Sequence, residues 1–132
     1  RGAAYGATVA NLLQAIGQVL TEVPNRLTLE GHTDAQPFAG GERSYGNWEL
    51  SADRANASRR ELVAGGLPDD RVLRVQGLAS SQLLDAADPR SASNRRISII
   101  VMNRDAEDRM FRTAPEVAEA LAPPSSPALP AR

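Results

Sequence analysis

Apolar residues recur at three- and four-residue steps in the first part of the chain, as they do on one face of an α-helix. The residues with this spacing are Val9, Leu12, Leu13, Ile16, Val19, Leu20 and Val23. Pro24 follows them, and proline disrupts a helix because it lacks a backbone N–H and its ring clashes with the preceding turn. We therefore predict an amphipathic helix that ends before Pro24.

Three later segments have the composition of β-strands. They are 27–29, where two leucines alternate with polar neighbours, 72–76, and the apolar run 97–102. Leu73 and Val75 are expected on one side of the second strand, because successive side chains point to opposite faces. The first strand leads directly into Gly-His-Thr-Asp at 31–34.

A second helix is predicted between the first two strands. Asn47 can cap its start, Glu49 lies in its first turn, and either Gly65 or Gly66 can adopt the left-handed conformation that ends it. Its inner face is expected to comprise Leu50, Ala55, Ser58 and Leu62.

The order helix, strand, helix, strand, strand contains a βαβ unit, whose two strands should be parallel. We therefore predict an α/β fold, a two-layer sandwich of a sheet and helices. Segments 105–112 and 115–121 could form short helices, but four prolines among Ser and Ala at 123–130 predict a disordered tail. We divide the chain into one domain at 1–104 and an extension at 105–132.

Composition narrows the functional classes. The chain has 132 residues, 42% of them apolar, which is enough for one core. Its net charge of −1 gives no attraction to nucleic acid or to an anionic membrane. It has no Cys, which excludes disulfides, thiol nucleophiles and cysteine metal sites. No apolar run reaches 18 residues, so we expect membrane or export signals either to lie outside this sequence or to be absent.

Glu30, His32 and Asp34 lie two residues apart and would share a face if the strand continued. A metal site is one interpretation, but zinc normally needs three or four ligands with imidazole or thiolate among them, and His32 is the only His. A hydrogen-bonded His32 that shapes the turn is favoured over a ligand. Glu30 and Asp34, or Asp34 and Glu49, could instead hydrolyse a glycoside if the fold sets the right separation.

Asp34 and Arg54 form a more informative pair. Asp34 follows the first strand, and Arg54 lies about two turns into the next helix. In a βαβ unit these positions border the same crevice, where ligands usually bind. A carboxylate and a guanidinium on one pocket suit a small zwitterion. The alternatives are a plain salt bridge between the two residues, or two independent surface charges.

The segment 47–55, Asn-Trp-Glu-Leu-Ser-Ala-Asp-Arg-Ala, resembles the N-x-x-L-S-x-x-R-A signature of OmpA-like peptidoglycan-binding domains. The Gly-His-Thr-Asp turn at 31–34 resembles the same family's G-H-T-D turn. Segments 47–60 and 94–99 are similar to flagellar stator proteins of the MotB family in particular. Trp48 and the insertion at 37–45 favour that family over outer-membrane porins or Pal lipoproteins. The resemblance covers about residues 9–104.

This resemblance implies a mixed sheet and a domain that binds peptidoglycan without catalysis. It implies that Asp34 and Arg54 hold the diaminopimelate of the stem peptide. Matched positions that would shape or border the pocket are Thr33, Asn47, Leu50 and Arg95. For the last three we keep structural alternatives open: a helix cap, a core residue and a solvated strand end. Trp48 is interpreted as packing that anchors the insertion.

The resemblance also implies a periplasmic domain, a homodimer and, in a complete protein, one N-terminal transmembrane helix in the inner membrane that partners MotA to conduct ions. It implies no cofactor, metal or nucleic acid. A Pal- or OmpA-type module of another envelope protein is the alternative, with a cell-wall hydrolase behind it.

Two features depart from the family pattern. The usual first strand is not evident in 1–7, which predicts a sheet with an open edge. Ser58 stands where the wider signature has an apolar residue.

The last strand is apolar on both faces, so we expect a second subunit or segment 105–112 to cover Ile100 and Met102. The loop at 37–46 is expected to act as a lid over the pocket, because its glycines allow many backbone states. The alternative is a fixed insertion held by Phe38 or Tyr45.

Overall fold

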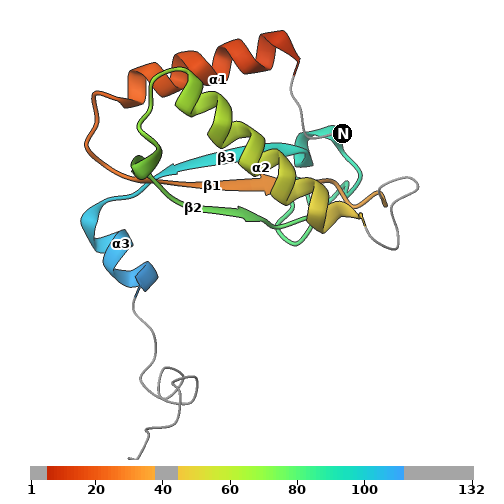
Figure 1. The fold of residues 1–132 in the computed structure, drawn as a ribbon. Coiled ribbons are helices and arrows are strands. Elements are labelled where there is room, and N and C mark those ends of the chain that lie inside the picture. The colour runs from red at the N-terminus through yellow and green to blue at the C-terminus, as the bar shows by residue number, and fades with distance from the viewer. Residues whose placement is uncertain (1–5, 38–44, 112–132) are drawn as a thin grey trace, which may run out of the picture.

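The computed structural model describes residues 6–37 and 45–111. Its elements are α1 (Ala7–Leu20), β1 (Leu27–His32), α2 (Asn47–Ala64), η1 (Asp69–Arg71), β2 (Val72–Gly77), η2 (Ala92–Asn94), β3 (Arg96–Val101) and α3 (Arg104–Phe111). The sheet order is β2-β1-β3, with β1 parallel to β2 and antiparallel to β3. Helices α1 and α2 lie on the same face of this sheet (Figure 1). The predicted two-layer α/β sandwich with a mixed sheet is confirmed.

The core lies between α1, α2 and the central strand. Its buried apolar side chains are Leu13, Leu27, Leu29, Leu62 and Leu67. All four residues predicted for the inner face of α2 are buried. Ser58 is tolerated there because its hydroxyl donates a 2.6 Å hydrogen bond to the carbonyl of Ala55, so no polar atom is left unsatisfied.

Helix α1 buries only part of its apolar stripe. Leu13 and Gly17 are buried, and Gly17 lies so close to α2 that an added Cβ would overlap the carbonyl of Leu62. The residues of the predicted stripe that are instead exposed are Val9, Leu12 and Val19. The prediction of the helix is correct, but its apolar stripe is wider than the face that α2 and the sheet cover.

Strand β2 departs from simple alternation. The register shifts between Leu27 and Thr28, which pair with Val72 and Arg74. As a result Val72 joins Val75 against the core, and the prediction that Leu73 and Val75 lie on one side of the strand is wrong. A bulge moves one residue out of the ladder, and strand periodicity alone does not reveal it.

Within the described residues, strand β3 pairs only with β1, and its other edge has no strand partner there. Before α1 the structure describes only Gly6, which is not in a strand. Met102 is buried, whereas Ile100 and Val101 are partly exposed. The backbone of Met102 bonds to Arg26 and to the Asn25 side chain. Cover of Ile100 by a second subunit stays a prediction.

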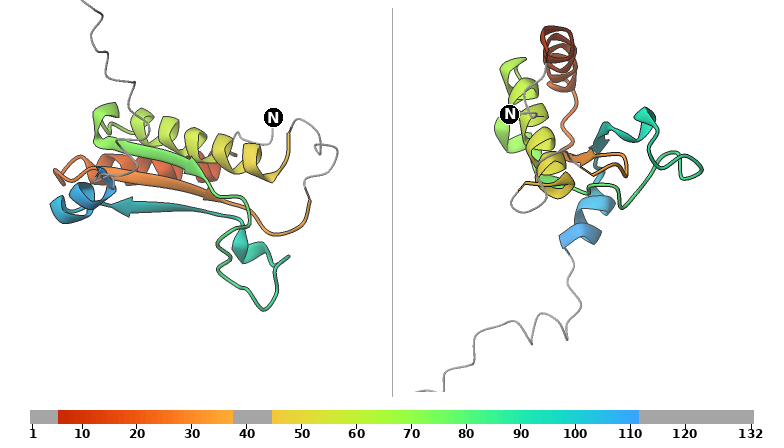
Figure 2. Two further views of the ribbon diagram at one scale, coloured as in Figure 1. Left: turned by 90° about the horizontal axis from the view of Figure 1, so that it is seen from below. Right: turned by 90° about the vertical axis from the view of Figure 1, so that its right-hand side faces the viewer.

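Helix α3 extends away from the sheet, beyond the end of the strands (Figures 1 and 2). It corresponds to the segment predicted at 105–112, and Asn103 caps it through a 2.7 Å bond from the N–H of Ala106. The segment 115–121, the proline-rich tail and most of the predicted lid lie outside the described residues. Among the helices that the structure describes, none is long and apolar enough to cross a membrane.

Candidate functional site

The candidate site lies where β1 ends and the chain turns toward α2. Gly31 in β1 lies directly beneath α2, and an added Cβ there would overlap the carbonyl of Ser51. Gly77 in β2 approaches Ala52 in the same way. These two glycines allow the first turns of α2 to lie directly on the ends of β1 and β2, which positions the helix beside the residues that follow His32.

In this turn, both carboxylate oxygens of Asp34 have hydrogen-bond partners. Its side chain is only 10% exposed. One carboxylate oxygen, Oδ1, accepts a 3.0 Å bond from the N–H of Gln36, and Oδ2 lies 2.6 Å from Nη1 of Arg95. The neighbouring N–H of Ala35 donates to the carbonyl of Pro89 at 2.9 Å. The charge of the buried carboxylate is therefore balanced by Arg95, which lies 61 positions later in the sequence.

A pocket of about 320 Å³ surrounds this carboxylate. The residues that line it are Thr33, Asp34, Gln36, Pro37, Asn47, Leu50, Arg54 and Arg95. All six residues predicted for the site are therefore brought together. They come from the end of β1, the first turns of α2 and the start of β3, and they include one acidic and two basic side chains.

The structure defines the roles of two lining residues, Asn47 and Leu50. Asn47 does not cap α2, because the cap residue is Gly46, whose N–H is bonded by Glu49. The amide of Asn47 instead donates a 2.9 Å bond to the carbonyl of Gln36, which ties the turn to the helix. Leu50 is both a buried core residue and part of the pocket wall.

Sequence patterns missed the residues that hold the pocket together. Asn94 is fully buried and accepts a 2.7 Å bond from the N–H of Asp85. It donates to the carbonyls of Asp85, Asp88 and Pro89 at 3.1–3.3 Å. It therefore organises the loop that presents Arg95. Its place directly before Arg95 in the Asn-Arg-Arg run was the one available signal.

A second support links α2 to the turn. The hydroxyl of Ser51 accepts a 3.0 Å bond from the N–H of Ala79, and the carbonyl of Ala79 accepts a 2.8 Å bond from Thr33. Ala79 has a φ of 49°, a left-handed conformation that non-glycine residues rarely adopt. Gln36 and Pro37 were likewise not predicted as lining residues.

Glu30 and His32 do not contribute to this pocket. His32 is 1% exposed, and its Nε2 lies 3.4 Å from Oε1 of Glu30, which is long for a hydrogen bond. Among the described residues neither ring nitrogen has a well-formed hydrogen-bond partner, so the predicted hydrogen bond of His32 is not confirmed. Burial and the nearby Arg96 lower the pKa of His32, against a smaller opposing effect of Glu30. Within the described residues no three His, Asp or Glu side chains converge as metal ligands.

Tyr45 and Trp48 lie where the insertion joins α2. Trp48 is 58% exposed, so the domain that the structure describes does not bury it, and its predicted packing on 38–44 lies outside those residues. Tyr45 donates a 2.7 Å bond to Oδ2 of Asp53 in α2. The C-terminal end of the insertion is thus attached to α2.

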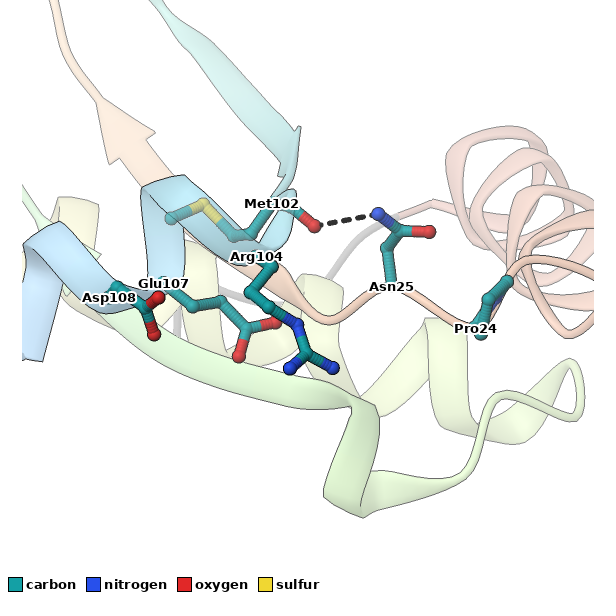
Figure 3. Close-up of a pocket in the computed structure, with 6 residues that line it drawn as sticks. All are labelled: Pro24, Asn25, Met102, Arg104, Glu107 and Asp108. Atoms are coloured by element: carbon teal, nitrogen blue, oxygen red, sulfur yellow. Dashed lines mark hydrogen bonds between the residues drawn. The ribbon is translucent and has the colours of Figure 1, made fainter.

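A second pocket, of about 360 Å³, lies at the opposite end of β1 (Figure 3). It is lined by Pro24, Asn25, Met102, Arg104, Glu107 and Asp108. Glu107 forms a 2.7 Å ion pair with Arg26, which lowers the pKa of its carboxyl group. This pocket is slightly larger, but it contains none of the residues that the sequence motifs single out, so volume alone does not identify the site.

Comparison with known proteins shows the family of this chain. Residues 6–96 match the OmpA family. Motility protein B of Escherichia coli K12 is 54% identical over 101 residues, which are 76% of this chain and 33% of that protein. The chain thus spans about a third of the length of this relative.

Two solved structures share the fold. The cell wall anchor of the T6SS from Pseudomonas aeruginosa has a TM-score of 0.64 and 28% identity, over 77% of this chain and 71% of that one. The peptidoglycan-associated lipoprotein from Burkholderia pseudomallei has a TM-score of 0.58 and 25% identity, over 75% and 81%. With the match over residues 6–96, these likenesses establish that the chain belongs to the OmpA family.

Proposed function

We propose that this domain binds peptidoglycan without catalysis, and that it holds the diaminopimelate of the stem peptide between Asp34 and Arg54. The observation that carries this proposal is the pocket at the end of β1, where one carboxylate and two guanidinium groups line the same space. When not cross-linked, diaminopimelate ends in an ammonium and a carboxylate on one carbon. Charge-assisted bonds to Asp34 and Arg54 would fix both groups at once.

The neutral lining residues suit the rest of such a ligand. Leu50 offers an apolar surface for the methylene chain of diaminopimelate. The hydroxyl of Thr33 donates a 2.9 Å bond to the backbone carbonyl of Asp34 and so steadies the turn. Asn47 holds the same turn from α2. We assign Thr33 and Asn47 to the shape of the pocket and Arg95 to its cationic side.

The absence of catalysis is supported by the position of the carboxylates. Asp34 is the one acidic side chain among the described lining residues, whereas glycoside hydrolysis normally needs a pair. Glu30 is bonded instead to Gln76, at 2.7 Å. We therefore expect no turnover when the purified domain is incubated with intact cell-wall sacculi.

The relatives support a role in a flagellar stator. The 54% identity to motility protein B favours motility over the other envelope systems, although the cell wall anchor and the lipoprotein share the fold. We propose that the domain lies in the periplasm and that it anchors a stator to the cell wall. The whole protein would be a homodimer that reaches MotA through one N-terminal transmembrane helix. We keep 1–104 as the binding domain and 105–132 as its extension.

Cosedimentation with diaminopimelate-type sacculi tests the proposal. We expect Asp34→Ala and Arg54→Ala to abolish cosedimentation while circular dichroism and the unfolding midpoint show a folded domain. Free meso-diaminopimelate should compete with the sacculi for the unmodified protein. Matched controls are Arg74→Ala on the exposed side of β2 and Asp105→Ala in α3, which should bind normally. Unchanged binding by both pocket variants would refute the assignment.

A further inference from the structure

The carboxylate of Asp34, to which a ligand ammonium would bind, already contacts the guanidinium of Arg95. Nη1 of Arg95 lies 2.6 Å from Oδ2 of Asp34, and the N–H of Gln36 bonds to Oδ1. Under the proposed function, a ligand ammonium must reach the same carboxylate. It would therefore share Oδ2 with the guanidinium of Arg95 or displace it.

The two partners differ in how freely they can move. The Asp34 side chain is 10% exposed and is held by the turn that Thr33 and Asn47 secure. The Arg95 side chain is 48% exposed, and the residue lies between η2 and the first residue of β3. A displaced Arg95 can rotate into solvent or onto a neighbouring anion, whereas Asp34 stays in place.

We propose that Arg95 is a specificity-determining residue, which yields Asp34 only to an ammonium that has a carboxylate on the same carbon. This inference rests on the proposed function of the pocket. It assigns to Arg95 the exclusion of ligands that carry an ammonium alone, such as the side chain of a lysine at the same position of a stem peptide.

Charge accounts for the selectivity. Among the lining residues that the structure describes, two are basic and one is acidic, an excess of positive side chains. A lone ammonium increases this excess and leaves the guanidinium of Arg95 without a counterion. A zwitterionic end group adds no net charge. When its ammonium displaces Arg95 from Asp34, its carboxylate can bind the Arg95 guanidinium through two oxygens and so replace the carboxylate of Asp34.

Isothermal titration with two soluble stem peptides tests this role. The peptides are identical except that one has meso-diaminopimelate at the third position and the other has L-lysine. We expect the unmodified domain to prefer the diaminopimelate peptide by about tenfold or more. In Arg95→Gln the preference should fall to about threefold or less, because the lysine peptide gains affinity once Asp34 is unmasked.

Two further variants make the outcome decisive. Arg95→Lys keeps the competing charge and should retain most of the preference, although a lysine cannot bind a carboxylate as a fork. Arg74→Gln removes the same charge from an exposed site in β2 and should leave both affinities unchanged. If Arg95→Gln retains the preference, or weakens both peptides equally, the specificity role is refuted while the binding function stands. If the unmodified domain binds neither peptide, the proposed function fails and this inference fails with it.

Discussion

The hydroxyl of Ser51, in the second turn of α2, accepts a 3.0 Å hydrogen bond from the backbone N–H of Ala79. Both residues are buried, and the same hydroxyl donates to the carbonyl of Trp48 within the helix. Through this contact the helix fixes the left-handed residue that in turn bonds to Thr33. The shape of the candidate pocket therefore depends on a residue that is not among its described lining.

Ser51→Ala should destabilise the domain by about 1–3 kcal/mol, because it leaves the buried N–H of Ala79 without a partner. Urea unfolding followed by circular dichroism measures this difference. The matched control is Ser81→Ala, whose exposed hydroxyl bonds only to the nearby carbonyl of Leu78, and which should cost less than about 0.5 kcal/mol. Equal stability of the two variants would show that the Ser51 contact is unimportant.

Gly31→Ala should destabilise the domain by about 3 kcal/mol or more, since the added methyl group overlaps the backbone of α2 at Ser51 and neither element can move cheaply. Thermal unfolding and soluble yield report the effect. Gly6→Ala is the control, because an added Cβ at Gly6 meets nothing within 4 Å. A Gly31→Ala protein as stable as the Gly6→Ala protein would contradict the close approach of α2 to β1.

His32 should make the domain less stable in mild acid. Burial and Arg96 lower its pKa in the folded state, so below the ordinary value of about 6.5 the unfolded chain binds a proton that the folded domain resists. The stability that neutral His32 contributes is therefore complete above about pH 6.5. It is lost as the pH falls toward the pKa of His32 in the folded state, by at most about 1.4 kcal/mol per pH unit.

The measurement is a urea titration at several pH values between about 5.5 and 7.5. His32 is the only His and the chain has no Cys, so few other groups titrate in this window. His32→Gln should flatten the profile. An unchanged slope in that variant would assign the pH dependence to another group.

Asn94→Ala should cost about 2–3 kcal/mol, because it removes a fully buried amide that bonds to three carbonyls and one N–H of the loop before β3. Binding to sacculi should weaken as well, since the loop presents Arg95 and contacts Ala35 through Pro89. Ser93→Ala, one residue earlier and exposed, is the control. Full binding by a folded Asn94→Ala protein would show that the pocket does not depend on this loop.

Much of the fold follows from local patterns. The spacing of apolar residues predicted α1, and the helix signals at Glu49 and at Gly65 and Gly66 predicted where α2 begins and ends. Asp34 and Arg54 could be assigned to one pocket because a βαβ unit places a strand end and the next helix side by side.

Other features depend on contacts between segments that are distant in the sequence. The pairing of Asp34 with Arg95 joins residues 61 positions apart and arises from the antiparallel placement of β3. Asn47 is of a residue type that often caps helices, but its side-chain amide donates instead to the carbonyl of Gln36. Helix-capping preferences do not predict this partner. The shift between Leu27 and Thr28 likewise depends on the whole sheet.

The central position of β1 has a mechanical consequence for an anchor. This strand bonds to β2 on one side and β3 on the other, and Asp34 follows it after one intervening residue. A pull on Asp34 along the strand axis would load the hydrogen bonds of both ladders at the same time, in shear. An edge strand bearing the ligand could instead be peeled away one bond after another. Under the proposed function, tension from the cell wall would therefore be shared by the hydrogen bonds of both ladders before any single one must break.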